Sequence, residues 1–140
     1  MMPTVTFSLS EANALVPRVA LLMQQIQHAA LRLQSEAEAH ADTLGGSVAD
    51  VSPRDLALAR PAARALIETL DGALGALQAL GVEVKDLRLG LCDFPSRQQG
   101  EIVYLCWQTG EPEIGFWHRT DEGFTGRRPL PGATGSPPLQ

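Results

Sequence analysis

The residues with the most varied chemistry are concentrated between positions 93 and 118. This stretch, DFPSRQQGEIVYLCWQTGEPEIGFWH, holds both tryptophans, the single tyrosine, one of two cysteines and one of three histidines of a chain that is 5% aromatic. A histidine near carboxylates is typical of metal binding or acid–base chemistry, because imidazole titrates near neutral pH and is a common metal ligand. The sequence therefore predicts a candidate metal or small-molecule site near His118, Glu111 and Asp93.

Structural roles would also explain these side chains. His118 can be a strand-end histidine bonded to a nearby carbonyl group, and Asp93 and Glu111 can be solvated acids of a strand end and a turn. The separation of Cys92 and Cys106 matches no zinc knuckle. We therefore expect both thiols to act as small buried apolar groups.

Lys85 is the only lysine in a chain with ten arginines. Lysine is a compact point charge and does not replace arginine, so its position beside Asp86 indicates either a specific role or chance. The sequence lacks the glycine-rich nucleotide loops, the Walker A sequence, the nucleophile elbow and the HExxH zinc motif. No reaction and no cofactor is predicted, and whether the chain is an enzyme stays open.

Three predicted strands form a β-meander that positions these residues, at 87–94, 102–107 and 113–118. The loops suggest that Phe94 lies opposite Ile102 and that Cys106 lies opposite Ile114. One face then carries leucines and both tryptophans, and we expect the helices to pack on it. The other face carries the more reactive side chains: Arg88, Gly90, Cys92, Phe94, Ile102, Tyr104, Cys106, Ile114, Phe116 and His118.

In this register Asp93 and Glu113 project away from His118, and Glu111 lies in a turn. A slip of one residue would exchange the faces of the slipped strand, because side chains alternate with period two. The second face is too apolar to be left in water. It is therefore predicted either to bind a partner chain or to line a pocket.

The helices that must support this sheet are predicted from the first eighty residues. Apolar residues recur at steps of three and four from Leu15 to Ala37. Ser10 is a plausible N-cap for this helix, and Ser8 with Glu11 would make a capping box. A break at 42–53 separates this segment from a heptad pattern that runs from Leu56 to Leu80, with a regular helix from Pro61 and a stop at Gly81. The predicted fold class is α+β: a long antiparallel helical hairpin with a coiled-coil seam, at about 10–80, packed on a three- or four-stranded antiparallel meander, at about 84–120. TVTF at 4–7 is expected as the fourth strand, within a single domain at 1–130 that precedes a disordered tail at 131–140.

The chain resembles a family of small bacterial proteins of unknown function, DUF2203. The resemblance rests on Phe7, Glu11, Ala12, Asn13, Leu15 and Pro17, and on the motifs VKD at 84–86, GL at 90–91, DFP at 93–95, VYLCW at 103–107, GEPE at 110–113, FWH at 116–118, GF at 123–124 and GR at 126–127. Ser8 stands where the family often has threonine. The resemblance implies no biochemistry, but it implies one shared feature, a fold element or a site, that includes Lys85, Asp86, Asp93, Glu111, Trp117 and His118.

The composition excludes several classes of function. The net charge is −5 and no basic stripe exists, so nucleic-acid binding and binding to anionic membranes are disfavoured. The N-terminus has no secretory signal pattern, and no apolar run approaches the roughly 20 residues of a membrane helix. We therefore expect a soluble cytoplasmic protein.

Two functions remain. The first is a non-enzymatic binding or assembly module that forms a homodimer through the second sheet face or the helical seam. The alternative is a metal- or small-molecule-binding protein, and possibly an enzyme, with its site near His118, Glu111 and Asp93. The predicted ligand or partner surface comprises Lys85, Asp86, Arg88, Asp93, Tyr104, Glu111, Phe116 and His118.

Overall fold

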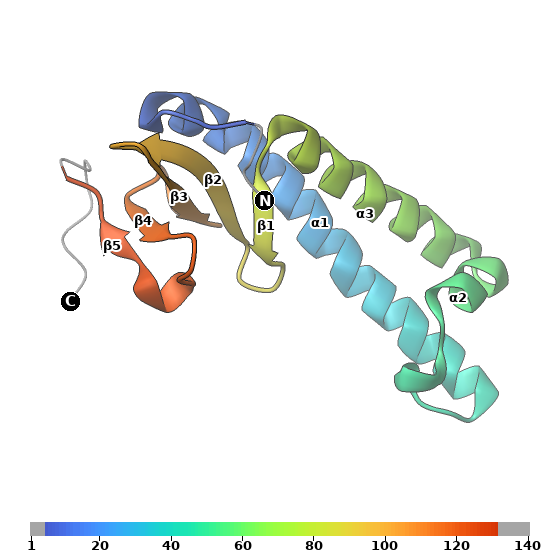
Figure 1. Ribbon diagram of the computed structural model, residues 1–140. Coiled ribbons are helices and arrows are strands. Elements are labelled where there is room, and N and C mark those ends of the chain that lie inside the picture. Colours follow the sequence, from blue (N-terminus) through green and yellow to red (C-terminus); the bar gives the residue numbers. More distant parts are fainter. Residues whose placement is uncertain (1–4, 132–140) are drawn as a thin grey trace.

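Long helices pack on one face of an antiparallel sheet in the computed structural model, which describes residues 5–131 (Figure 1). The helices are α1 (Leu9–Leu44), α2 (Pro53–Ala59) and α3 (Pro61–Leu80), with short 3-10 turns η1 (Val48–Asp50) and η2 (Phe124–Gly126). The sheet has the order β1-β2-β3-β4-β5, formed by Glu83–Asp86, Leu91–Gln98, Glu101–Gln108, Phe116–Arg119 and Arg128–Pro129. The α+β class is confirmed, but the sheet has five strands and not three or four. The predicted tail lies, except for Pro131, outside the described residues.

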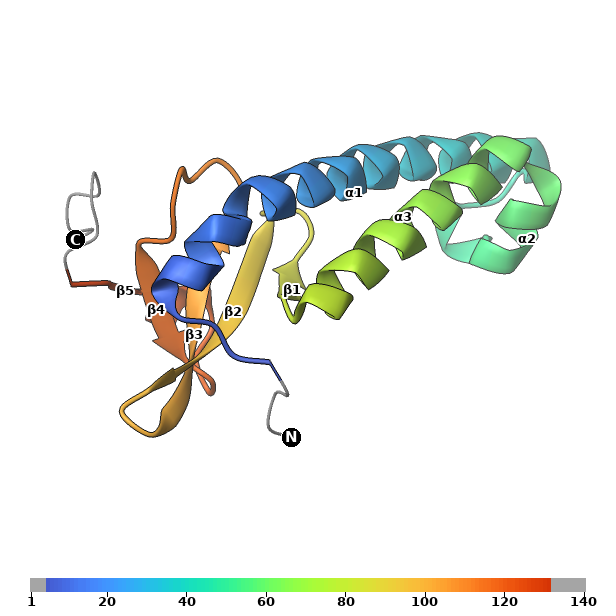
Figure 2. The same ribbon diagram turned by 90° about the horizontal axis from the view of Figure 1, so that it is seen from above.

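The helix boundaries follow local signals in the sequence. Ser8 and Glu11 form the predicted capping box, since Ser8 N donates to Glu11 Oε1 at 2.8 Å and Glu11 N donates to Ser8 Oγ at 3.1 Å. Helix α3 begins at Pro61 and ends before Gly81, whose φ of 92° is the left-handed conformation that glycine adopts readily. α3 returns beside α1, and α2 lies at their far end (Figure 2). The coiled-coil seam between these helices stays a prediction.

The core lies between the first half of α1, the end of α3 and one face of the sheet (Figure 1). α1 contributes one buried stripe, and the sheet contributes Cys92, Phe94, Leu105 and Trp107. The second half of α1 extends beyond the sheet together with α2 and the start of α3. None of the helices within 5–131 has the length and apolar composition needed to cross a membrane.

The N-terminal TVTF segment is not the expected strand; Thr4 lies outside the described residues, and residues 5–7 have no strand structure. Phe7 N instead donates one hydrogen bond to Pro95 O at 2.8 Å. That bond lies beyond Asp93, the last β2 residue that pairs with β1. In a strand, the N–H and C=O groups of one residue point to the same side. The C=O of Pro95 points toward Phe7, beyond the end of β1, so an N–H at this position would have had no β1 residue to pair with, and proline is tolerated.

The turn after β2 is shorter than the sequence suggested. β2 continues to Gln98, which pairs with Glu101, so only Gln99 and Gly100 form the connection. Their φ values of 51° and 84° are both positive, as a two-residue hairpin turn of the I′ type requires. Phe94 consequently pairs with Leu105, three residues away from its predicted partner.

A shift of three residues is odd, so it exchanges the two faces of β2. Asp93 lies on the same face as His118, and Cys92 lies on the helix-facing side. The predicted faces of β2 are therefore wrong. Between β3 and β4 the shift is two, because Cys106 pairs with Phe116. The predicted faces of β3 and β4 are therefore correct, but the predicted strand at 113–118 is too long: Ile114, expected on the outer face, precedes β4 and packs in the core beside α1.

Candidate functional site

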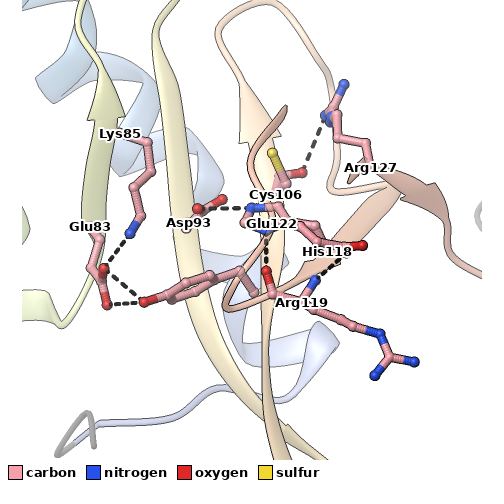
Figure 3. A network of polar contacts seen from close by, with 9 residues as sticks. Glu83, Lys85, Asp93, Cys106, His118, Arg119, Glu122 and Arg127 are labelled. Carbon is pink, nitrogen blue, oxygen red and sulfur yellow. Dashed lines mark hydrogen bonds and ion pairs between the residues drawn. The ribbon is translucent and has the colours of Figure 1, made fainter. Parts of the chain in front are cut away.

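Three buried side chains from adjacent strands meet on the sheet face that points away from the helices. Asp93 of β2, Cys106 of β3 and His118 of β4 are 1%, 2% and 3% exposed. One oxygen, sulfur or nitrogen atom from each lies within 4.8 Å of the others. The strand register brings these three side chains together (Figure 3). Asp93 pairs directly with Cys106, and His118 pairs with Tyr104, which lies two residues before Cys106 and therefore on the same face of β3.

The hydrogen bonds of His118 determine how many protons the cluster holds. Nδ1 lies 2.8 Å from Arg119 O, and Nε2 lies 2.9 Å from Asp93 Oδ2. A carbonyl oxygen only accepts, so Nδ1 carries a hydrogen and donates it. The contact between Nε2 and Oδ2 then needs one more proton, held by either the imidazole or the carboxyl group. Asp93 and His118 thus share a single proton.

Burial makes the charged forms of the Asp93 carboxyl group and the Cys106 thiol costly. Desolvation raises the pKa of Asp93 despite the opposing effects of His118 and Lys85. Asp93 Oδ1 is buried and has no hydrogen-bond partner among the described residues. The nearby Cys106 thiol lowers the pKa of Asp93, but it does not form a hydrogen bond of acceptable geometry with Oδ1. Burial and the charge of Asp93 raise the pKa of Cys106 to about 12, so Cys106 is a neutral thiol near neutral pH.

A pocket of about 100 Å³ opens beside this cluster. Asp93, Cys106 and His118 line it together with Lys85, Tyr104 and Phe124. It has room for a few water-sized groups, because one water occupies about 30 Å³ in the liquid. The cluster is therefore next to a space that a small ligand could enter.

Lys85, Glu83 and Tyr104 form a polar network at one side of this pocket (Figure 3). Lys85 Nζ donates to Glu83 Oε1 at 2.8 Å and lies 4.4 Å from the centre of the Tyr104 ring. The Tyr104 hydroxyl donates to the same carboxylate at 3.0 Å. Burial lowers the pKa of Lys85, but Glu83, Tyr104 and Asp93 outweigh that effect and raise it, so the amine is a cation.

Residues 119–129, here called the strap, run from the end of β4 through η2 to β5, and four of them line the pocket beside the cluster. Arg127 fastens the strap, since its guanidinium donates to Glu111 Oε1 at 2.8 Å and lies 4.1 Å from the ring centre of Phe116. Arg128 donates to Glu122 at 2.8 Å within the strap. The apolar face that the sequence left without a cover is thus closed by the chain itself.

Residues 5–130 match the model of a family described as an uncharacterized conserved protein, DUF2203. The chain belongs to this family. No curated protein and no solved structure matches it. The membership expected from the sequence motifs is confirmed, and the site of this DUF2203 protein must be interpreted from its own geometry.

The predicted surface residues of the DUF2203 chain separate into three places. Lys85, Asp93, Tyr104 and His118 line the pocket. Glu111 and Phe116 contact Arg127 outside the cluster, so Glu111 is not beside His118. Asp86 accepts a hydrogen bond from Leu89 N within the turn after β1, and Arg88 lies in that same turn. The structure therefore brings four of the eight residues together.

Sequence reasoning missed Cys106 as a member of the cluster. It expected both thiols on one face, but Cys92 packs in the core and Cys106 contributes to the site. It also missed Glu83 and the pairing of Arg127 with Glu111. The sequence feature that could have predicted this arrangement is the pair Gln99 and Gly100. A two-residue turn at these positions fixes the register of β2 and β3 and places Cys106 opposite Asp93.

A larger hollow of about 470 Å³ lies at the other face and far end of the sheet of this DUF2203 protein. Its titratable side chains, Glu101 and Arg119, form an exposed ion pair at 3.9 Å. Exposed pairs of this kind contribute little to stability. We place the site at the smaller pocket, because within residues 5–131 it is the one where buried metal-ligating side chains converge.

Proposed function

We propose that this chain binds a divalent transition metal ion, such as Zn²⁺, through Asp93, Cys106 and His118. One observation supports this most strongly: the three side chains are almost fully buried, and their ligand atoms lie within 4.8 Å of one another. Burying such groups is costly unless they are paired or bind a metal. Asp93 Oδ1 has no partner among the described residues, so the cluster is incomplete without a further group.

The geometry of the cluster fits zinc. A tetrahedral zinc ion holds nitrogen and oxygen ligands at about 2.0–2.2 Å, which separates them by roughly 3.4 Å. The distance of 2.9 Å between His118 Nε2 and Asp93 Oδ2 would need to open by only about half an ångström. The other ring nitrogen already donates to Arg119 O, as metal-bound histidines usually do to a carbonyl or carboxylate.

The set of donors favours a borderline metal over calcium or magnesium. Thiolate and imidazole ligands suit Zn²⁺, whereas Ca²⁺ and Mg²⁺ prefer oxygen ligands. Three protein ligands leave a fourth position, which would face the adjacent pocket. Sites of this kind can hold an exchangeable water or a small molecule, so an enzymatic role is compatible with the site.

Metal titration of the untagged, metal-free protein tests this proposal. Competition with a chromophoric chelator should give one zinc ion per chain, and Co²⁺ should give a thiolate-to-metal absorption band. Cys106→Ser and Cys92→Ser are matched variants, because both thiols are buried but only Cys106 belongs to the cluster. Cys106→Ser should lose at least about 100-fold in affinity and also lose the thiolate band.

Cys92→Ser should bind the metal like the wild type, even if it is less stable. Folding of each variant is checked by circular dichroism before titration. Equal metal affinity in the two variants, or a wild-type cobalt complex without a thiolate band, would overturn the proposal.

The homodimeric assembly module stays a prediction with weaker support. It was motivated by the apolar second face of the sheet, but Cys106 and Phe116 on that face are only 2% and 6% exposed in a single chain. Exposed apolar side chains, among them Leu31, Leu58 and Leu89, remain as surface that a second copy could cover. Native mass spectrometry of the same sample gives the subunit count. The cytoplasmic location likewise stays a prediction.

A further inference from the structure

We propose that the ligand of this metal site is a small carboxylate, such as formate or acetate, bound jointly by the metal and by Lys85. This inference rests on the proposed metal site. It extends that proposal because it names the ligand class and assigns a role to the only lysine of the chain.

Lys85 has a hydrogen-bond donor to spare at the pocket. Its ammonium group has three N–H bonds. Within 5–131, one is directed to Glu83 Oε1 at 2.8 Å, and the ring of Tyr104 lies 4.4 Å from Nζ. At least one N–H therefore remains for a ligand. The two contacts also hold the flexible lysine stem against the pocket wall, which reduces the entropy lost on binding.

The pocket limits the size and shape of the ligand. A volume of about 100 Å³ next to the cluster holds about three or four non-hydrogen atoms, if each takes the roughly 30 Å³ of a water. Leu91 and Phe124 line the pocket and provide an apolar wall. An anion with a small apolar substituent, such as acetate, matches both features.

The open metal position and the spare N–H of Lys85 favour an anionic oxygen at the pocket once the metal is bound, although the charges of the surrounding groups balance. Two carboxylates near the pocket are already paired: Glu83 accepts from Lys85 and Tyr104, and Glu122 accepts from Arg128 and from the Arg119 amide. A divalent metal is neutralised by the Asp93 carboxylate and the Cys106 thiolate, but its fourth position still attracts an anionic oxygen. The second carboxylate oxygen can then accept from Lys85.

The test uses the cobalt-substituted full-length protein, because the visible bands of Co²⁺ change when a ligand enters its coordination sphere. Acetate is titrated into the wild type, with acetamide as a neutral molecule of the same shape. Lys85→Met removes the ammonium group and keeps the length of the side chain. Arg88→Met is the matched control, since it removes a cation from the nearby turn that does not line the pocket.

Acetate should change the cobalt bands with a millimolar dissociation constant, and acetamide should not. Lys85→Met should raise that constant at least tenfold, whereas Arg88→Met should change it less than twofold. Acetate without effect, or equal constants in the two variants, would overturn this inference and leave the metal site intact. Failure of cobalt to bind at all would overturn the proposed function, and this inference with it.

Discussion

Asp93 Oδ2 and His118 Nε2 lie 2.9 Å apart in the interior, although 25 residues separate the two side chains in the sequence. Neither group is more than 3% exposed. Because Nδ1 donates to Arg119 O, the pair must share one proton. A buried pair of this kind is weak evidence for stability, since desolvation offsets much of the attraction. It therefore suggests a functional role and leads to the first two predictions.

Asp93→Asn should fold and should gain stability over the wild type as the pH rises. The amide group can donate to His118 Nε2, so the hydrogen bond is kept. Burial raises the pKa of Asp93 above 3.8, so the native state binds more protons than the unfolded state above that pH. The wild type therefore loses the stability that protonation of Asp93 contributes as the pH rises through the raised pKa. The variant does not lose it, because asparagine has no carboxyl group to titrate.

Urea denaturation from pH 4 to pH 8 measures this difference. The free energy of unfolding of Asp93→Asn should exceed that of the wild type by about 1–3 kcal/mol at pH 8, and the difference should shrink toward pH 4. The same variant should bind zinc at least about tenfold more weakly. A wild type that becomes more stable than the variant with rising pH would contradict the shared-proton interpretation.

Zinc binding should release about two protons near neutral pH. Metal binding requires a thiolate, but the pKa of Cys106 is about 12, so the thiol proton must leave. The proton between Asp93 and His118 must leave as well, because the metal takes both lone pairs. The apparent affinity should therefore rise about 100-fold for each pH unit.

Calorimetric titration of the metal in two buffers of different ionisation enthalpy counts these protons. A value near two is expected between pH 6.5 and 7.5. Release of about one proton or fewer would show that Cys106 stays a thiol and does not bind the metal.

Much of the fold could be predicted because local chemistry specifies it. The Ser8–Glu11 capping box, the helix start at Pro61 and the stop at Gly81 depend on residues within one helical turn. The period-two pattern also placed Tyr104 and His118 on one face of the sheet. These features need no knowledge of which segments meet in space.

The composition of the cluster was harder to predict because it depends on register. Pro95 suggested a loop, but it is tolerated in β2, where the ladder with β1 has already ended. The extended β2 moved the turn to Gln99 and Gly100 and brought Asp93 to the face of His118. Cys106 has no sequence feature that separates a ligand from a buried thiol, so only tertiary pairing identifies it.

Gly90 should be essential for the start of β2. Its φ is 68°, and a Cβ at this position would lie 2.7 Å from the Cβ of Thr109, whose amide donates to Gly90 O. Gly90→Ala should therefore combine backbone strain with a collision and reduce the free energy of unfolding by about 3 kcal/mol. It should also weaken zinc binding, because Asp93 lies near the same end of β2.

Gly100→Ala is the matched control for backbone strain alone. Gly100 has a φ of 84°, but an added Cβ would meet no atom within 4 Å. The expected loss is about 1 kcal/mol with unchanged zinc affinity. Urea denaturation and metal titration of both variants test the comparison. Equal losses of stability would show that contact with Thr109 is unimportant.

Arg127→Met should loosen the strap that lines the pocket beside the cluster. The Arg127 side chain is 8% exposed and donates to both carboxylate oxygens of Glu111, at 2.8 and 2.9 Å. Methionine can still pack on Phe116, so the main loss is the ion pair. Removing one partner of a largely buried pair leaves Glu111 uncompensated and should reduce the free energy of unfolding by about 2–4 kcal/mol.

The double variant Arg127→Met with Glu111→Gln separates charge from packing. Glutamine can still accept from Gln108 N, which donates to Glu111 in the wild type at 2.7 Å. The double variant should therefore be more stable than Arg127→Met alone, because no unpaired charge is left. Hydrogen exchange should show faster exchange of the strap amides in the single variant. If the single variant matches the wild type in both urea denaturation and exchange, Arg127 does not hold the strap in place.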